Sequence, residues 1–112
     1  MRPESQKLLL DMLEAAKAIR EFVRDKTVAD FKQDALLRSG IYFNFIVIGE
    51  ALSQLKRFDE QIAEQIGEHT KIVGFRNQIV HGYSRLDDEI TWRIIETDLS
   101  TLQSDIESLM QS

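Results

Sequence analysis

The chain has no cysteine, and its 112 residues include only one proline and five glycines. Without cysteine it has no disulfide, no thiolate nucleophile and no Cys-based metal site. The glycines are scattered, so no glycine-rich phosphate loop is present. The longest apolar run, from Ile41 to Ile48, contains Asn44 and is far shorter than the roughly 20 residues of a membrane helix. We therefore expect a soluble, cytoplasmic protein without a membrane segment or signal peptide.

Acidic residues outnumber basic ones, 19 to 14, which gives a formal net charge of -5. Because Lys and Arg supply most of the affinity for phosphates, this balance argues against a general nucleic-acid binder. However, residues 69–86 contain no Asp or Glu, although they include Lys71, Arg76, Arg85 and both histidines. Such a run also arises by chance, since the apolar segment 35–49 lacks acids too. We favour a local anion site in residues 69–86.

Apolar residues recur at three- and four-residue intervals along most of the chain, and the alternation typical of strands is absent. The pattern predicts helices over residues 5–25, from a Thr27–Asp30 capping box to Lys56, over 59–66, over 70–81, and from an Asp87 or Asp88 cap to Leu109. Residues 84–86 form a brief connection. We expect one domain over residues 1–112, an all-α, up-and-down bundle of four main helices plus a short one.

The second predicted helix is apolar around its whole circumference. Such a helix is buried on more than one side, and a second protomer would cover it most easily in a domain of this size. Gly40 and Gly49, which are costly inside a helix, would permit close backbone approach at that contact. We therefore expect a homodimer, with Phe45 facing outward. The apolar residues are Leu36, Leu37, Ile41, Phe43, Phe45, Ile46, Val47, Ile48, Ala51, Leu52 and Leu55.

The candidate chemistry lies in the segment Arg76-Asn77-Gln78-Ile79-Val80-His81-Gly82-Tyr83. Arginine is always charged and histidine exchanges its proton near neutral pH, so the pair can hold a phosphate and move a proton. On one straight helix the two side chains lie about 140° apart and cannot reach the same atom. Either the helix ends at His81 and the chain turns at Gly82, or the cooperating Arg and His come from two copies of the chain.

This segment, Arg-Asn-x-x-x-His-x-Tyr, resembles the motif of the HEPN superfamily, and in particular that of its HepT-like ribonuclease toxins. Ile72-Val73-Gly74-Phe75 precedes the motif, and the earlier block Ile48-Gly49-Glu50-Ala51 is similar to a second landmark of the family. The resemblance extends over residues 7–109. It departs at residues 68–71, Glu-His-Thr-Lys, where many relatives have a Pro-Trp pair, and this difference concerns the shape of the cleft rim.

The resemblance implies a homodimeric HEPN fold whose two motifs meet in a cleft and cleave RNA without metal or cofactor. In that family role Arg76 would hold the scissile phosphate, His81 would act as general base or acid, and Asn77 would support them. Tyr83 matches the tyrosine to which a minimal nucleotidyltransferase antitoxin attaches AMP, which silences the toxin. The implied partners are a second copy of the chain, that antitoxin and the RNA substrate.

Each motif residue also has a purely structural interpretation. His81 could be hydrogen-bonded at a helix end, Asn77 could face solvent, and Tyr83 could cover a helix junction. Arg76 could pair with an acid, but Glu68 and Asp87, the nearest in sequence, are too distant for a helical pair, so we expect it to be free.

Metal binding has little support, because His69 and His81 are twelve residues apart and no carboxylate accompanies His81 at ligand spacing. The alternative function is a non-catalytic HEPN subunit that binds a nucleotide or docks beside a minimal nucleotidyltransferase. The presence of Arg76, His81 and Tyr83 together favours the enzyme, since a scaffold does not need all three.

Overall fold

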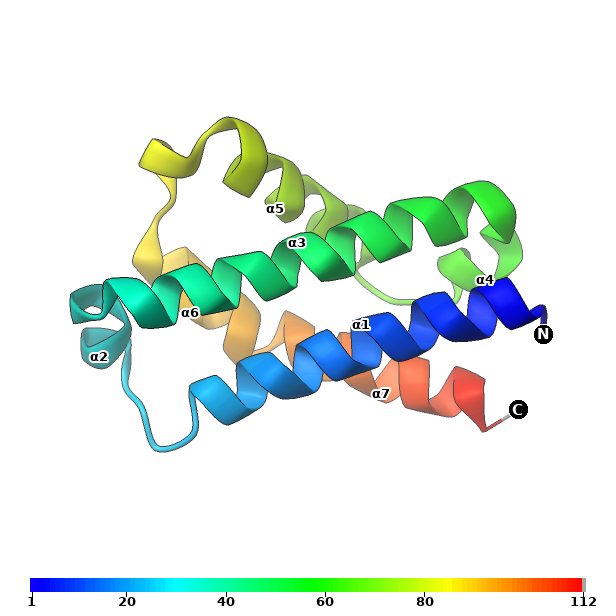
Figure 1. The fold of residues 1–112 in the computed structure, drawn as a ribbon, viewed down its shortest axis with the longest axis horizontal. Helices are drawn as coiled ribbons and strands as arrows, with labels where there is room; N and C mark the ends of the chain where they lie inside the picture. Colours follow the sequence, from blue (N-terminus) through cyan, green and yellow to red (C-terminus); the bar gives the residue numbers. More distant parts are fainter. Residues whose placement is uncertain (112) are drawn as a thin grey trace.

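The structure, a computed structural model, describes residues 1–111, and its secondary structure over that range consists of helices without strands (Figure 1). The elements are α1 (Pro3–Phe22), α2 (Val28–Gln33), α3 (Ala35–Phe58), α4 (Glu60–Glu64), α5 (His69–His81), the 3-10 turn η1 (Tyr83–Arg85), α6 (Asp88–Glu96) and α7 (Asp98–Met110). Helices α1, α3, α5 and the α6–α7 pair alternate in direction, so the two termini lie at the same end (Figure 1). The predicted all-α, up-and-down bundle is therefore confirmed.

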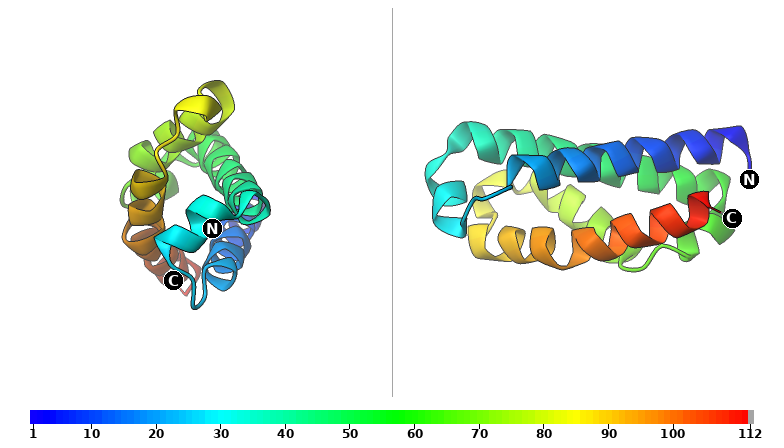
Figure 2. Two further views of the ribbon diagram at one scale, coloured as in Figure 1. Left: turned by 90° about the vertical axis from the view of Figure 1, so that its left-hand side faces the viewer. Right: turned by 90° about the horizontal axis from the view of Figure 1, so that it is seen from below.

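The helices surround one hydrophobic core. The end-on view of Figure 2 shows how they are arranged around the long axis of the molecule. Helix α3 is the central element, because it contacts α1, α2, α4 and α5. By length and composition alone α3 could also cross a membrane, a property that it shares with core helices of soluble proteins. Its neighbours identify it as the core helix of a compact globular protein. The largest fully buried side chains are Leu9, Met12, Ile19, Phe31, Ile41, Phe45, Ile48, Leu52, Leu55, Ile66, Ile72 and Leu99.

The helix predicted from Thr27 to Lys56 is two helices. The capping box at its start is confirmed, since the Thr27 hydroxyl accepts from the Asp30 amide and the Asp30 carboxylate accepts from the Thr27 amide. The chain leaves helical geometry at Asp34 (φ -115°, ψ 96°), whose carboxylate accepts from the Leu37 amide and begins α3. This break lets Phe31 enter the core, where its ring centroid lies 5.7 Å from that of Trp92.

The last predicted helix is also divided, at Thr97. Asp87 is its cap, because the Asp87 carboxylate accepts from the amides of Glu89 and Ile90. The Thr97 hydroxyl donates to the Arg93 carbonyl at 2.8 Å, a local bond that competes with helix geometry, and α7 begins at the next residue. Most of the predicted apolar stripe is buried, but Ile90 is 48% exposed.

The prediction that Phe45 faces outward is wrong. Phe45 is fully buried, and its ring packs edge-on against Phe75 with centroids 5.1 Å apart. The large apolar residues of α3 that face solvent are instead Leu36, Phe43 and, at the end of the helix, Phe58, which are 85%, 63% and 56% exposed. Helical spacing explains the difference, since Phe45 shares the side of α3 that carries the buried Ile41 and Ile48.

The two α3 glycines make their close contacts within their own chain, and this corrects their assignment to a second protomer. A Cβ at Gly40 would lie 3.2 Å from Cε2 of Phe22. A Cβ at Gly49 would lie 2.4 Å from Cβ of Arg76, a separation that no real side chain adopts. Gly49 therefore lets α5 approach α3 at the residue that begins the motif.

Candidate active site

Helix α5 carries the motif, and its buried stripe fixes the direction in which each motif residue points. Ile72, Phe75 and Ile79 are buried against the core, as expected for the helix predicted over residues 70–81. The Phe75 ring packs between those of Phe45 and Tyr42. With this face turned inward, Arg76 lies beside α3, whereas Asn77 and His81 are on the exposed side.

Arg76 is held by an acid from α3, so the expectation of a free arginine is wrong. Its Nη2 forms an ion pair with Oε1 of Glu50, and its Nη1 donates to Oδ1 of Asn77 at 2.8 Å. The side chain is only 23% exposed, and its buried Nε has no partner among the described residues. Glu50 is 26 residues away in sequence, outside the range of helical-pair rules. The Ile48-Gly49-Glu50-Ala51 block was the signal that could have identified it.

His81 and Asn77 share an open hollow on the outer side of α5. Its lining residues are Gly74, Asn77, Gln78, His81, Gly82, Arg85 and Leu86. None of the described residues that line the hollow is acidic, and Arg85, which lies outside the Arg-Asn-x-x-x-His-x-Tyr motif, contributes a cation. No hydrogen-bond or ion-pair partner of the His81 ring occurs among residues 1–111. The ring is therefore available to a ligand.

Arg76 and His81 of one chain are not brought together. The helix ends at His81 as predicted, but Arg76 does not line the hollow that His81 occupies. Gly82 has φ -144° and ψ 38°, which is not the left-handed conformation that favours glycine. Asn77 connects the two, because it accepts a hydrogen bond from Arg76 and lines the hollow with His81.

Tyr83 lies immediately after the helix, in η1, and is 54% exposed. Its ring stacks edge-on against Tyr42, with centroids 5.6 Å apart. Tyr42 is a buried support, since it is 4% exposed and its hydroxyl lies 3.0 Å from that of Thr91. Burial also raises the pKa of the Tyr42 hydroxyl. The Tyr83 hydroxyl has no partner among the described residues. The ring is thus held in place while the hydroxyl stays accessible.

A sequence profile of the ribonuclease HepT-like family matches residues 12–109. The chain belongs to this family. The resemblance predicted from the motif is thereby confirmed, and the protein is a HepT-like ribonuclease by family. HepT-like proteins are typically paired with a nucleotidyltransferase antitoxin.

Two relatives illustrate how far the similarity extends. A protein of Thermococcus cleftensis named "Probable ribonuclease HepT" is 24% identical over 109 residues, which are 97% of this chain and 98% of the relative. A protein of Methanocaldococcus jannaschii named "Putative RNase MJ1380" is 27% identical over 100 residues, which are 88% of this chain and 90% of the relative. No solved structure gives a significant match.

Proposed function

We propose that this protein is a metal-independent endoribonuclease, acting as a single domain and as a homodimer, with Arg76 and His81 as its catalytic residues. One observation carries the proposal: His81, without an internal partner, faces an acid-free hollow beside Asn77 and Arg85. A histidine that is free to exchange protons next to a cation is suited to chemistry at a phosphodiester. Membership of the HepT-like family supports the same substrate class.

RNA supplies its own nucleophile, the 2′-hydroxyl, so the protein needs to move protons and stabilise charge. The 2′-oxygen attacks the phosphorus, the bond to the 5′-oxygen breaks, and the products are a 2′,3′-cyclic phosphate and a 5′-hydroxyl. His81 takes the proton from the 2′-hydroxyl or gives one to the leaving 5′-oxygen. Arg76 stabilises the charge that builds up on the phosphate oxygens.

Two copies of the chain are needed to bring these groups together. Within one protomer Arg76 contacts Gly49 and Glu50 of α3, whereas His81 lines the outer hollow, so His81 of one protomer would cooperate with Arg76 of its partner. Glu50 and Asn77 each contact a terminal nitrogen of the Arg76 guanidinium and so fix its direction. Because Glu50 follows the exposed Phe43 by about two helical turns, this pair borders the apolar face of α3.

The proposed biological role is the toxin of a toxin–antitoxin pair in the cytoplasm. Its partner would be a minimal nucleotidyltransferase, which transfers AMP from ATP to Tyr83 and releases pyrophosphate. The exposed Tyr83 hydroxyl, held against Tyr42, is placed for such a transfer. A non-catalytic nucleotide-binding or docking subunit is the alternative, but the unoccupied His81 ring in an acid-free hollow favours the enzyme.

Cleavage of single-stranded RNA by the purified protein is expected to continue unchanged in excess EDTA. The product ends, read by mass spectrometry, should be a 2′,3′-cyclic phosphate and a 5′-hydroxyl, because the 2′-oxygen is the nucleophile. A matched oligonucleotide with 2′-deoxyribose at the cleaved position should resist cleavage. Loss of activity in EDTA that magnesium restores would contradict metal independence, and cleavage of the deoxy substrate would contradict the mechanism.

Incubation with the cognate nucleotidyltransferase, ATP and magnesium is expected to add AMP at Tyr83 and to stop cleavage. Each AMP brings a phosphodiester anion and a bulky group beside the His81 hollow, so it competes with RNA by charge and by volume. Tyr83→Phe keeps the ring against Tyr42 but lacks the acceptor oxygen, so it should cut RNA and resist silencing. Tyr42→Phe is the matched control, since it removes a buried hydroxyl but keeps the ring that supports Tyr83, so modification and silencing should proceed as in the parent. Equal silencing of Tyr83→Phe and the parent would refute the assignment.

A further inference from the structure

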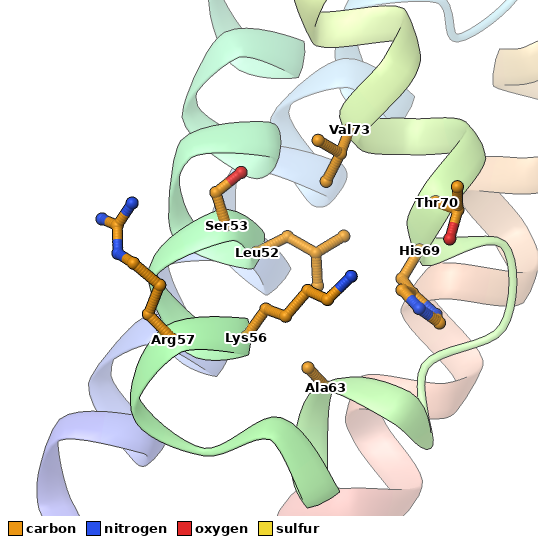
Figure 3. A pocket seen from close by; sticks show the side chains of 8 residues that line it. All are labelled: Leu52, Ser53, Lys56, Arg57, Ala63, His69, Thr70 and Val73. Atoms are coloured by element: carbon orange, nitrogen blue, oxygen red, sulfur yellow. The ribbon is translucent and has the colours of Figure 1, made fainter.

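A second hollow lies at the opposite end of α5, between the last turns of α3, helix α4 and the first turn of α5 (Figure 3). It has a cavity volume of 190 Å³ and an apolar floor, and none of the described residues that line it is acidic. The rim carries cations and hydroxyls. The lining includes Leu52, Ser53, Lys56, His69, Thr70 and Val73.

One cation of this hollow is available to a ligand. In Figure 3 the Lys56 side chain extends across the hollow towards α5, whereas the Arg57 head group points away from it. Lys56 has no ion-pair partner among residues 1–111, while Lys71, the cation at the start of α5, is engaged with Asp98 at 2.8 Å. The His69 ring is anchored by Nδ1, which lies 2.8 Å from the Ile66 carbonyl oxygen, so Nε2 remains for another contact.

A continuous face of α5 joins this hollow to the one beside His81. Thr70, Gly74, Asn77 and His81 follow at three- and four-residue intervals and so share one side of the helix. They span about 16 Å along the axis, at about 1.5 Å per residue. No acid occurs in residues 69–86, and a Cβ at Gly74 would have nothing within 4 Å. A polyanion can therefore lie against this face without meeting a carboxylate of α5 itself or a bulky side chain at Gly74. The Glu50 carboxylate of α3, which Arg76 holds near Asn77, is neutralised by that arginine.

We propose that this face is an RNA track, and that the hollow at Lys56 and His69 is a subsite for a backbone phosphate of single-stranded RNA beyond the scissile one. The inference rests on the proposed ribonuclease function and extends it by assigning a second contact point to the substrate. Lys56 supplies the charge, the Ser53 and Thr70 hydroxyls supply neutral donors, and the apolar floor accepts a sugar or a base edge. The distance between the two hollows requires more than one nucleotide step.

Binding of RNAs of two lengths tests the subsite. The probes are 2′-O-methyl oligonucleotides, which lack the nucleophile and are not cleaved, one of three nucleotides and one of twelve. We expect Lys56→Ala to reduce, by about fivefold at 0.1 M salt, the ratio of the affinity for the longer RNA to that for the shorter one. For the longer RNA, the slope of log affinity against log salt concentration should become shallower by about 0.7. Lys17→Ala is the matched control, because Lys17 is exposed on α1, on the other side of α3 from α5 (Figure 1).

A pair of substitutions at Gly74 tests the track between the two hollows. Gly74→Gln and Gly74→Glu have the same length and differ in charge, and the open space at this position accepts either side chain. We expect Gly74→Glu to bind the twelve-nucleotide probe about tenfold more weakly than Gly74→Gln, because its carboxylate repels the adjacent phosphates. Equal affinity of the two variants would show that RNA does not lie on this face.

The outcomes separate this inference from the proposed function. A parent protein that binds the longer RNA through Lys56 but cuts no RNA would refute the ribonuclease and keep the track. A parent that cuts RNA while Lys56→Ala and Lys17→Ala behave alike would keep the enzyme and refute the subsite. If Lys56→Ala lowers the affinity for both probes by the same factor, the subsite is also refuted, since the substitution would then affect binding at the His81 hollow.

Discussion

Replacing His81 with alanine is expected to lower the rate of RNA cleavage by about 10²–10⁴-fold, the usual contribution of one general acid or base. His81 is exposed at the last position of α5, so the helical circular dichroism and the dimer mass should match those of the parent. The loss should appear in kcat, because the ring acts on protons rather than on binding. Cleavage that survives the substitution at the parental rate would refute the mechanism.

Arg76→Ala is the companion measurement and should cost about 10²–10³-fold, the scale for removal of one donor that stabilises transition-state charge. Glu50→Gln keeps the shape of the arginine's partner but removes its charge, so it should cost less than Arg76→Ala. A rate for Glu50→Gln as low as that for Arg76→Ala would mean that Glu50 itself takes part in the reaction. Stability should change little, since the Glu50 side chain is 46% exposed.

Much of the fold could be predicted from the sequence, because amphipathic spacing and caps are local signals. The capping box at Thr27 and the end of the motif helix at His81 agree with the sequence prediction, and the cap of the last helix is Asp87, one of the two aspartates that the sequence offers. The breaks at Asp34 and Thr97 were missed, since each depends on a side chain that competes with the helix in a way that spacing does not reveal. An aspartate can continue a helix or begin the next one, and the burial of Phe31 favours the second outcome here.

The site was less predictable than the fold, because its contacts join residues that are far apart in sequence. The motif includes Arg76 and His81 but not Glu50, the acid that holds Arg76. The role of Gly49, which lets α5 approach α3 at Arg76, becomes evident only when the two helices are seen packed together. The sequence does not show that Phe45 is buried, because a helix that is apolar around its whole circumference gives no sign of which side packs against the other helices of the same protomer. Arg85 was recognised only as part of an acid-free segment, and its place beside His81 depends on η1.

The exposed side of α3 makes Phe43 the residue at which the proposed dimer should be most sensitive. Phe43→Glu is expected to weaken dimerisation by about 3–5 kcal/mol, or roughly 10²–10⁴-fold in dissociation constant, because it buries an unpaired charge between protomers. The isolated protomer should still fold, since Phe43 is 63% exposed within it, whereas Phe45→Glu should unfold the fully buried core. Leu10→Glu, at a 43% exposed position of α1, is the control that should leave the dimer unchanged.

If the cleft is shared, Phe43→Glu should sediment as a protomer of 13.0 kDa and should lose RNA cleavage together with the dimer. Mixing two inactive variants gives the sharper test of a shared cleft. A heterodimer of Arg76→Ala with His81→Ala has one cleft that lacks both groups and one that retains both, because each cleft takes its arginine and its histidine from different protomers. Unfolding and refolding the two variants together should therefore restore cleavage that neither shows alone. A fully active protomer, or a mixture that stays inactive although heterodimers form, would show that Arg76 and His81 do not cooperate across the interface.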